Sequence, residues 1–317
     1  MATVHPPLSG SLAAPAASGS TLKRWITRHP VLTYLIVAYV VTWTIFAIPL
    51  LSRSGIGVLG FEAPPIEVFI LAAAVFGLAG SAFLVTAIVD GHSGVRALAS
   101  RYIRVRVGIQ WYLFAIFGLL ATALLGTMVV YGFAPLVALV QQWPLLIAYL
   151  MQVVLVTALV NLWEETGWTG FMFTRLQPRY GALVASLLVA PAFGGIHLPL
   201  LFVNDALTSG RLSPQEMPMF VLYLLVLFSV PVRIIASWLY NNARGSLLLV
   251  GLFHGALGAT AGGVVLPYLV PKSAHLTLEV YGAFAVLAVI LVAATRSRLS
   301  YKPNSPDLQP SPHGQER

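Results

Sequence analysis

Two adjacent glutamates and two distant histidines are the residues of this chain that could do chemistry in an apolar environment. Glu164 and Glu165 lie in the run NLWEETGWTGFMFT, although the chain has only ten acidic residues. His197 lies in FGGIHLPL and His254 in GLFHGALGA, and both runs are otherwise apolar. An ionised side chain in a membrane segment costs roughly a few kcal/mol and usually faces a bundle interior, a polar cavity or a partner. We therefore interpret the four residues as a catalytic centre buried among membrane helices.

This set of side chains favours hydrolysis by activated water. A carboxylate in an apolar pocket can act as a general base on water, and a neutral imidazole can share that water or stabilise an oxyanion. Glu164, His197 and His254 would also form a ligand set for a divalent metal such as zinc, with one position left for water, and this alternative stays open. The chain has no cysteine, no G-x-S-x-G and no HExxH zinc motif.

The composition predicts an all-α polytopic membrane protein. The 317 residues are 58% hydrophobic and 9% charged, whereas a soluble domain has about 25% charged residues. The lack of cysteine excludes disulfides and thiolate metal sites. The net charge of +8 is explained by basic cytoplasmic loops, so we expect the lipid bilayer and no nucleic acid as a partner.

Eight apolar stretches are long enough to be spanning helices, which need about 20 residues. We expect a transmembrane bundle over 23–298, between disordered tails at 1–22 and 299–317 that are rich in Pro, Ser and other small or polar residues. The spans are predicted at 31–51, 66–89, 111–133, 144–168, 182–203, 217–240, 246–269 and 277–295.

The placement of Lys and Arg predicts that both termini are cytoplasmic. With the N-terminus inside, fourteen basic residues fall on the inner side and three, Arg53, Arg211 and Lys272, on the outer side. This bias predicts a multi-pass protein of a plasma membrane, of the bacterial inner (cytoplasmic) membrane type. Arg233 lies within the sixth predicted span.

The glutamates and histidines are expected at similar depths. If the fourth helix continues to Arg175, Glu164 lies about 16 Å from that basic turn at 1.5 Å per residue. By the same rise, His197 lies about 24 Å beyond Gly181 and His254 about 15 Å beyond Arg244. Each residue alone has a plainer explanation, such as an interfacial Glu pair or a structural His. Their combination at one depth is typical of a site.

At these residues the chain resembles the CAAX prenyl endopeptidase and bacteriocin-processing family of intramembrane proteases (CPBP, also called Abi). The Glu-Glu-x-x-W-R-G motif of that family corresponds to EETGWTG, which begins at Glu164, and its Phe-x-x-x-His motif corresponds to Phe193 and His197. The third motif, a His four residues before Asn or Asp, corresponds to His254. The resemblance covers about 145–265.

The resemblance implies roles for the four candidates. Glu164 would activate water with His197 as its partner, His254 would hold the oxyanion, and Glu165 would orient the site. Two positions differ from the family pattern: Thr169 stands in place of Arg, and Gly258 in place of Asn or Asp. We hypothesise that Arg233 supplies the missing positive charge near Glu165.

The leading hypothesis is an intramembrane endopeptidase that cleaves peptides or membrane proteins, prenylated substrates among them, with zinc as the metal if it is a metalloprotease. One alternative is a weak or inactive family member that binds a peptide as a scaffold or immunity protein. The other is a proton- or cation-coupled transporter in which the Glu pair and the histidines relay protons or bind a cation.

Overall fold

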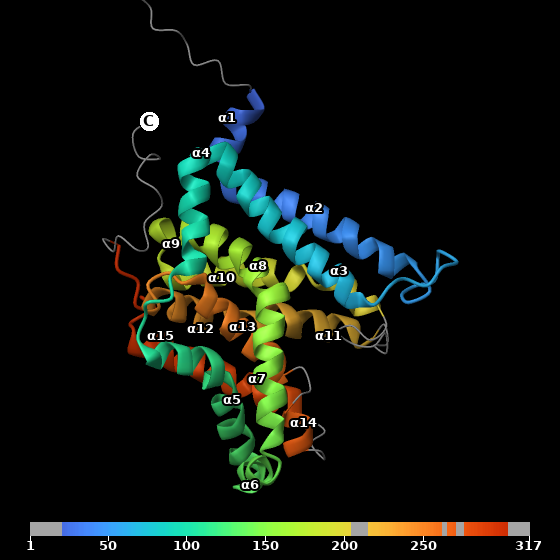
Figure 1. Cartoon of the computed structure of the whole chain (residues 1–317), viewed down its shortest axis with the longest axis vertical. Coiled ribbons are helices and arrows are strands. Elements are labelled where there is room, and N and C mark those ends of the chain that lie inside the picture. Colours follow the sequence, from blue (N-terminus) through green and yellow to red (C-terminus); the bar gives the residue numbers. More distant parts are fainter. Residues whose placement is uncertain (1–20, 204–214, 262–264, 271–275, 304–317) are drawn as a thin grey trace, which may run out of the picture.

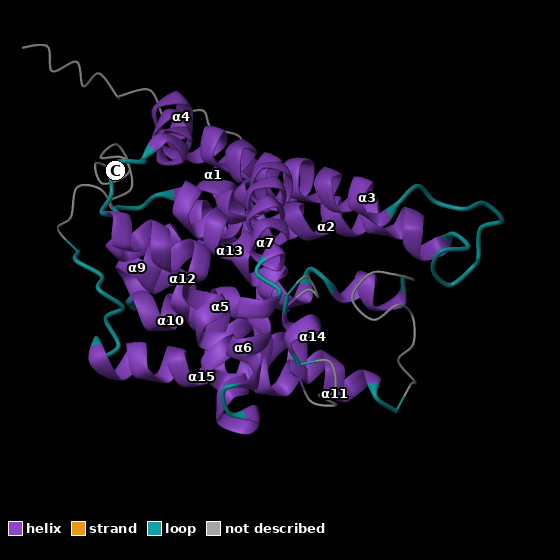
Figure 2. Ribbon diagram, turned by 60° about the horizontal axis from the view of Figure 1, so that its bottom comes forward, coloured by secondary structure: helices purple, strands orange, loops and turns teal. Residues whose placement is uncertain are grey.

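The structure, a computed structural model, describes residues 21–203, 215–261, 265–270 and 276–303. All regular secondary structure in these ranges is helical, as Figure 2 shows, and the all-α prediction is confirmed. The two predicted disordered tails lie mostly outside the described residues.

Seven segments of the described chain are long and apolar enough to cross a membrane. The eighth predicted span corresponds to helix α15 (Leu276–Ala294), whose apolar part, Leu278–Ala294, is shorter than the other seven. The first four long segments are α2 (Pro30–Leu51), Ile66–Ile103, α5 (Ile109–Tyr131) and Pro144–Tyr180. The other three are Ala182–Phe202, Met217–Asn242 and Leu247–Leu269.

Several of these segments contain successive helical elements. Ile66–Ile103 comprises α3 (Ile66–Ala72), the π-helix η1 (Ala73–Gly80), α4 (Ser81–Ser100) and η2 (Arg101–Ile103). The sixth segment comprises α11 (Met217–Leu222), η6 (Tyr223–Phe228) and α12 (Ser229–Asn242). The remaining elements are α1 (Thr21–Arg28), α6 (Ala134–Gln141), α10 (Ala182–Gly195), η5 (Leu198–Phe202), α13 (Leu247–Ala261) and α14 (Leu266–Leu269).

The fourth segment carries both glutamates and is one continuous run of helix from Pro144 to Tyr180. Its elements are α7 (Pro144–Val156), η3 (Thr157–Asn161), α8 (Leu162–Glu165), η4 (Thr166–Phe173) and α9 (Thr174–Tyr180). The continuation past the glutamates that the depth estimate assumed is therefore present. Both η3 and η4 are π-helical, a widened geometry that is frequent at functional sites.

The helices enclose the part of this fourth segment that carries the glutamates, from Glu164 to Phe173. In Figure 1, α2 and the α3–α4 segment run together along one side of the bundle, and α5 and α15 lie on the opposite side. Between them, α12 packs against α10 and α15, and α13 packs against α5, α7 and α8. The element α8, with Glu164 and Glu165, is therefore placed between η1 and α13.

The interior and the outer surface are both apolar. Tyr34, Trp168 and Phe193 are fully buried in the core, whereas Val129 is 87% and Met219 70% exposed. Exposed large apolar side chains in such numbers suit contact with lipid tails, which are as apolar as the side chains themselves. The surface thus agrees with the predicted membrane setting.

Two polar contacts tie the fourth segment to α4 and η2 near the predicted cytoplasmic end. Arg175 forms an ion pair with Asp90, and Arg101 donates a hydrogen bond to the carbonyl oxygen of Gly170. These contacts hold the helical turn that follows the glutamates. They help to fix where Glu164 and Glu165 lie relative to the first half of the chain.

The predicted orientation can be tested directly because the chain has no cysteine. We expect a thiol introduced by Lys302→Cys to react with a membrane-impermeant maleimide only after the cells are permeabilised. A thiol introduced by Arg53→Cys should react in intact cells. The reverse pattern would show that the termini are outside.

Candidate active site

Both glutamates point into the protein from α8. Glu164 is 7% exposed and Glu165 is 1% exposed. The side chains of adjacent helical residues point about 100° apart, so both can be buried only if other helices cover a wide part of the α8 surface. That cover is provided by η1 on one side and α13 on the other. The two carboxylates nevertheless have very different partners.

Glu165 is neutralised by Arg233 on α12. The Nη1 atom of Arg233 donates hydrogen bonds to Oε1 and Oε2 of Glu165 at 2.8 and 3.0 Å, and the arginine is itself 1% exposed. A buried charge without a counterion would be strongly destabilising, so this pair explains how Glu165 stays inside the bundle as a carboxylate. The hypothesised contact between Arg233 and Glu165 is present.

Thr169 joins the same network. Its hydroxyl donates to Oε2 of Glu165 and accepts a hydrogen bond of 2.6 Å from Nη2 of Arg233. By the family pattern, Thr169 stands in place of Arg, so the sequence alone indicates that a positive charge is missing here. In the structure it bridges the carboxylate to an arginine that comes from another helix.

His254 lies between the two glutamates. Its Nδ1 is 3.0 Å from Oε1 of Glu165, and its Nε2 is 4.0 Å from Oε2 of Glu164. A carboxylate paired with arginine can only accept, so Nδ1 of His254 donates to Glu165, and Nε2 is the ring nitrogen that faces Glu164. The 4.0 Å separation is too long for a direct hydrogen bond.

His197 reaches the same region from the end of α10. Its Nδ1 lies 2.9 Å from the carbonyl oxygen of Phe193, which can only accept, so Nδ1 is the donor in this contact. The rings of His197 and His254 lie 5.5 and 5.4 Å from the Phe193 ring. Glu164 and His254 are also electrostatic partners of His197.

All four predicted site residues are therefore gathered near Phe193 and α8. Glu165, His254 and Arg233 form a hydrogen-bonded set, whereas Oε2 of Glu164 is buried without a hydrogen-bond partner among the described residues. His197 contributes through Phe193 and through its electrostatic interaction with Glu164. Gly258 leaves open space, since an added Cβ would meet no atom within 4 Å.

Asn161 is a residue to which the sequence analysis assigned no role. It is 6% exposed, and its Oδ1 is buried without a hydrogen-bond partner in the described part of the chain. It precedes Glu164 by three positions, a spacing that places two residues on one helix face, and this is the signal that could have identified it. Asn161 is therefore a further polar group beside the glutamates.

A metal ligand set is not formed by the described side chains. Within the described ranges, no group of three or more His, Asp or Glu residues is arranged so that it could hold a metal ion. The zinc ligand set of Glu164, His197 and His254 does not fit this geometry, and we derive no chemical step through a metal.

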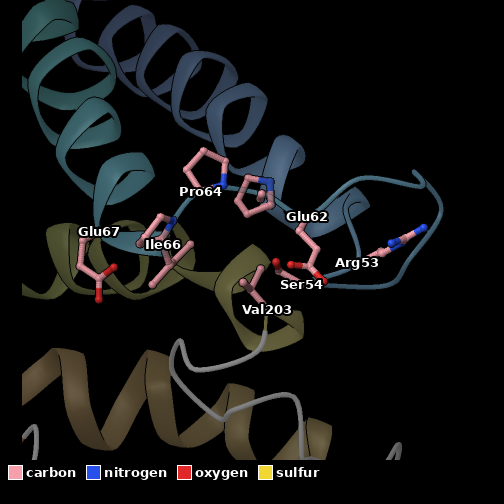
Figure 3. A pocket seen from close by; sticks show the side chains of 10 residues that line it. Arg53, Ser54, Glu62, Pro64, Ile66, Glu67 and Val203 are labelled. Carbon is pink, nitrogen blue, oxygen red and sulfur yellow. The ribbon is translucent and has the colours of Figure 1, made fainter.

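The cavity drawn in Figure 3 lies elsewhere. It has a volume of about 550 Å³ and is lined by Arg53, Glu62 and Glu67 together with neighbouring loop residues and Val203. It contains neither the glutamate pair nor either histidine. The candidate active site is therefore located by its chemistry and not by the size of a cavity.

The Glu165–Arg233 pair can be tested by moving the charge. Arg233→Leu leaves Glu165 buried without a counterion, and loss of one partner of such a pair costs about 3 to 5 kcal/mol. We expect a lower Tm for the detergent-purified variant. The double variant Arg233→Leu with Thr169→Arg places a guanidinium at the motif position instead, and it should recover part of the lost Tm. An unchanged Tm for Arg233→Leu would contradict the pairing.

Two comparisons with known proteins agree with the motif-based resemblance. The chain is 33% identical over 91 residues to a protein named "CAAX prenyl protease 2" from Methanococcus maripaludis, a match that covers 29% of this chain and 32% of that relative. The match therefore spans about a third of the length of the curated relative. Residues 142–260, which include both glutamates and both histidines, match the type II CAAX prenyl endopeptidase Rce1-like family, and the predicted resemblance to CAAX prenyl endopeptidases is thereby confirmed.

Proposed function

We propose that the protein is an intramembrane endopeptidase in which Glu164 activates the hydrolytic water. The observation that carries this proposal is the contrast between the two glutamates. Glu165 is paired with Arg233, whereas Oε2 of Glu164 is buried without a hydrogen-bond partner among the described residues and lies 4.0 Å from Nε2 of His254. A carboxylate that is not engaged by a counterion is available to take a proton from water.

In the proposed reaction, Glu164 accepts a proton while the water oxygen forms a bond to the scissile carbonyl carbon. The carbonyl π electrons move to the oxygen, which becomes a tetrahedral oxyanion. Glu164 then returns the proton to the leaving nitrogen as the C–N bond breaks. The products are a carboxylic acid and an amine, and the Glu164 carboxylate is regenerated.

The histidines take different parts in this scheme. The lone pair on Nε2 of His197 accepts the second hydrogen of the water and orients it. His254 donates to the oxyanion when Nε2 carries a proton, and the Glu165 carboxylate at Nδ1 balances the resulting charge. Glu165 is thus an orienting group, supported in turn by Arg233 and Thr169.

The proposed substrate is a peptide or the terminal segment of a membrane protein. The family match supports a peptide substrate and a membrane setting. We propose that prenylated peptides are among the substrates and that the protein resides in a plasma membrane of the bacterial cytoplasmic type. The inner excess of basic residues supports that location.

The first test is cleavage of a fluorogenic peptide panel, with prenylated and unmodified members, by detergent-purified protein. Glu164→Gln keeps the shape of the side chain and removes the base, so we expect kcat to fall about 10²- to 10⁴-fold. Glu67→Ala, which changes an exposed glutamate, is the matched control and should leave kcat unchanged. A parallel series with a chelator tests the metalloprotease alternative.

Equal cleavage by the wild type and Glu164→Gln would contradict the proposal. Ion flux in proteoliposomes without cleavage would favour the transporter alternative. Cleavage that the chelator abolishes would favour the metal-dependent version of the same reaction.

Gly258 favours a second candidate function, a weak or inactive family member that binds a peptide. Asn or Asp at the matching family position would offer a side chain that Gly258 lacks. An added Cβ at Gly258 has nothing within 4 Å, so the position has room for a larger residue. A protein that lacks one oxyanion donor would bind its peptide and cut it slowly.

Gly258→Asn tests this second candidate. Because one oxyanion donor is worth about 10²- to 10³-fold in kcat, we expect the variant to cleave the panel faster, by up to that factor. Gly282→Asn is the matched control, since an added Cβ there also meets no atom within 4 Å. Equal rates for the wild type and Gly258→Asn would show that Gly258 does not limit the reaction.

A further inference from the structure

Tyr34 is a buried polar residue that neither the motifs nor the proposed reaction uses. It lies in α2, outside the family match at 142–260, and it is 0% exposed. Its hydroxyl is buried without a hydrogen-bond partner among the described residues. Water is scarce inside a membrane protein, so an unsatisfied hydroxyl there costs free energy and calls for a partner.

The ring of Tyr34 is held firmly by the fourth segment. It makes an edge-to-face contact with Trp168, at 6.0 Å between ring centroids, and a tilted contact with Phe171 at 4.8 Å. These contacts leave the hydroxyl little freedom to move. The position of the oxygen is therefore determined by the packing of α2 against η1 and η4.

Gly167 makes room for this hydroxyl. A Cβ added at Gly167 would lie 2.0 Å from Oη of Tyr34, a separation that no side chain could tolerate. Gly167 follows Glu164 by three positions, so the hydroxyl enters the turn directly after the catalytic candidate. Both Glu164 and Glu165 are electrostatic partners of Tyr34.

The two unsatisfied groups are complementary. The Tyr34 hydroxyl can donate, and an ionised carboxylate can only accept. Glu165 already has Arg233, Thr169 and His254 as donors, whereas Oε2 of Glu164 has none among the described residues. Glu164 is therefore the carboxylate that needs a donor, and Tyr34 is a buried donor beside the same helical turn.

We propose that Tyr34 is a positioning residue whose hydroxyl is linked to the Glu164 carboxylate through one water, since neither Oη of Tyr34 nor Oε2 of Glu164 has a direct hydrogen-bond partner among the described residues. This inference rests on the proposed function of Glu164 as the base. This water-mediated link holds Oε2 in the orientation from which it takes the proton of the hydrolytic water. Gly167 is the sequence feature that admits the hydroxyl, and the first span becomes part of the site.

Tyr34→Phe tests this role because it keeps the ring contacts and removes only the hydroxyl. We expect kcat to fall about 10- to 100-fold, the value of a hydrogen bond to a charged group, with KM unchanged. The Tm should not fall. Tyr240→Phe is the matched control: Tyr240 is also 0% exposed with a buried hydroxyl that lacks a partner in the described chain, but it packs against Phe173.

Three results would overturn the inference: an unchanged kcat in Tyr34→Phe, a fall in kcat that only follows a fall in Tm, or an equal fall in Tyr240→Phe. The Glu164→Gln variant, measured alongside, shows separately whether the proposed function fails. An experimental structure of the wild type decides the geometry without any activity. It should place one water within hydrogen-bond distance of both Oη of Tyr34 and the Glu164 carboxylate, and a site without that water would exclude the role.

Discussion

The buried ion pair between Glu165 and Arg233 is the interaction on which the site depends. Removing two charges from water is expensive, and the cost is offset only when geometry is good and the remaining donors and acceptors are satisfied. Here the guanidinium contacts both carboxylate oxygens, while Thr169 and His254 supply two further hydrogen bonds. The pair joins α8 to α12, and His254 adds α13, so one carboxylate connects three helices.

This arrangement separates the roles of two neighbouring glutamates. Glu165 is fully engaged and accepts a hydrogen bond from Nδ1 of His254, whereas Oε2 of Glu164 has no hydrogen-bond partner among the described residues. Two identical side chains thus acquire different chemistry from their surroundings, because Glu165 faces the guanidinium of Arg233 whereas Oε2 of Glu164 has no hydrogen-bond partner among the described residues. The proposed division into an orienting group and a base follows from this difference.

The charge that opposes Glu165 comes from a different backbone position than in the family pattern. Thr169, one helical turn after Glu165, stands where the motif has arginine. The guanidinium that contacts Glu165 comes instead from Arg233, which follows Glu165 by 68 residues. The electrostatic requirement is met although the motif is incomplete. At Gly258, the second difference from the family pattern, there is room for a larger side chain, since an added Cβ would meet no atom within 4 Å.

The sequence by itself determined the all-α membrane class and seven of the span positions, because a continuous apolar run of about 20 residues is visible without any tertiary contact. It also pointed to the candidate site residues, because an ionisable residue within an apolar run is rare. The motifs around Glu164, His197 and His254 also sufficed for the family resemblance. The eighth predicted span coincides with α15, whose apolar part is shorter than the other seven segments. Only the tertiary structure decided which glutamate is paired with Arg233, which nitrogen of each histidine faces a neighbouring oxygen, and that the Tyr34 hydroxyl lies beside Gly167. These features depend on distances of a few ångströms between helices that are far apart in sequence, and no local pattern encodes such distances.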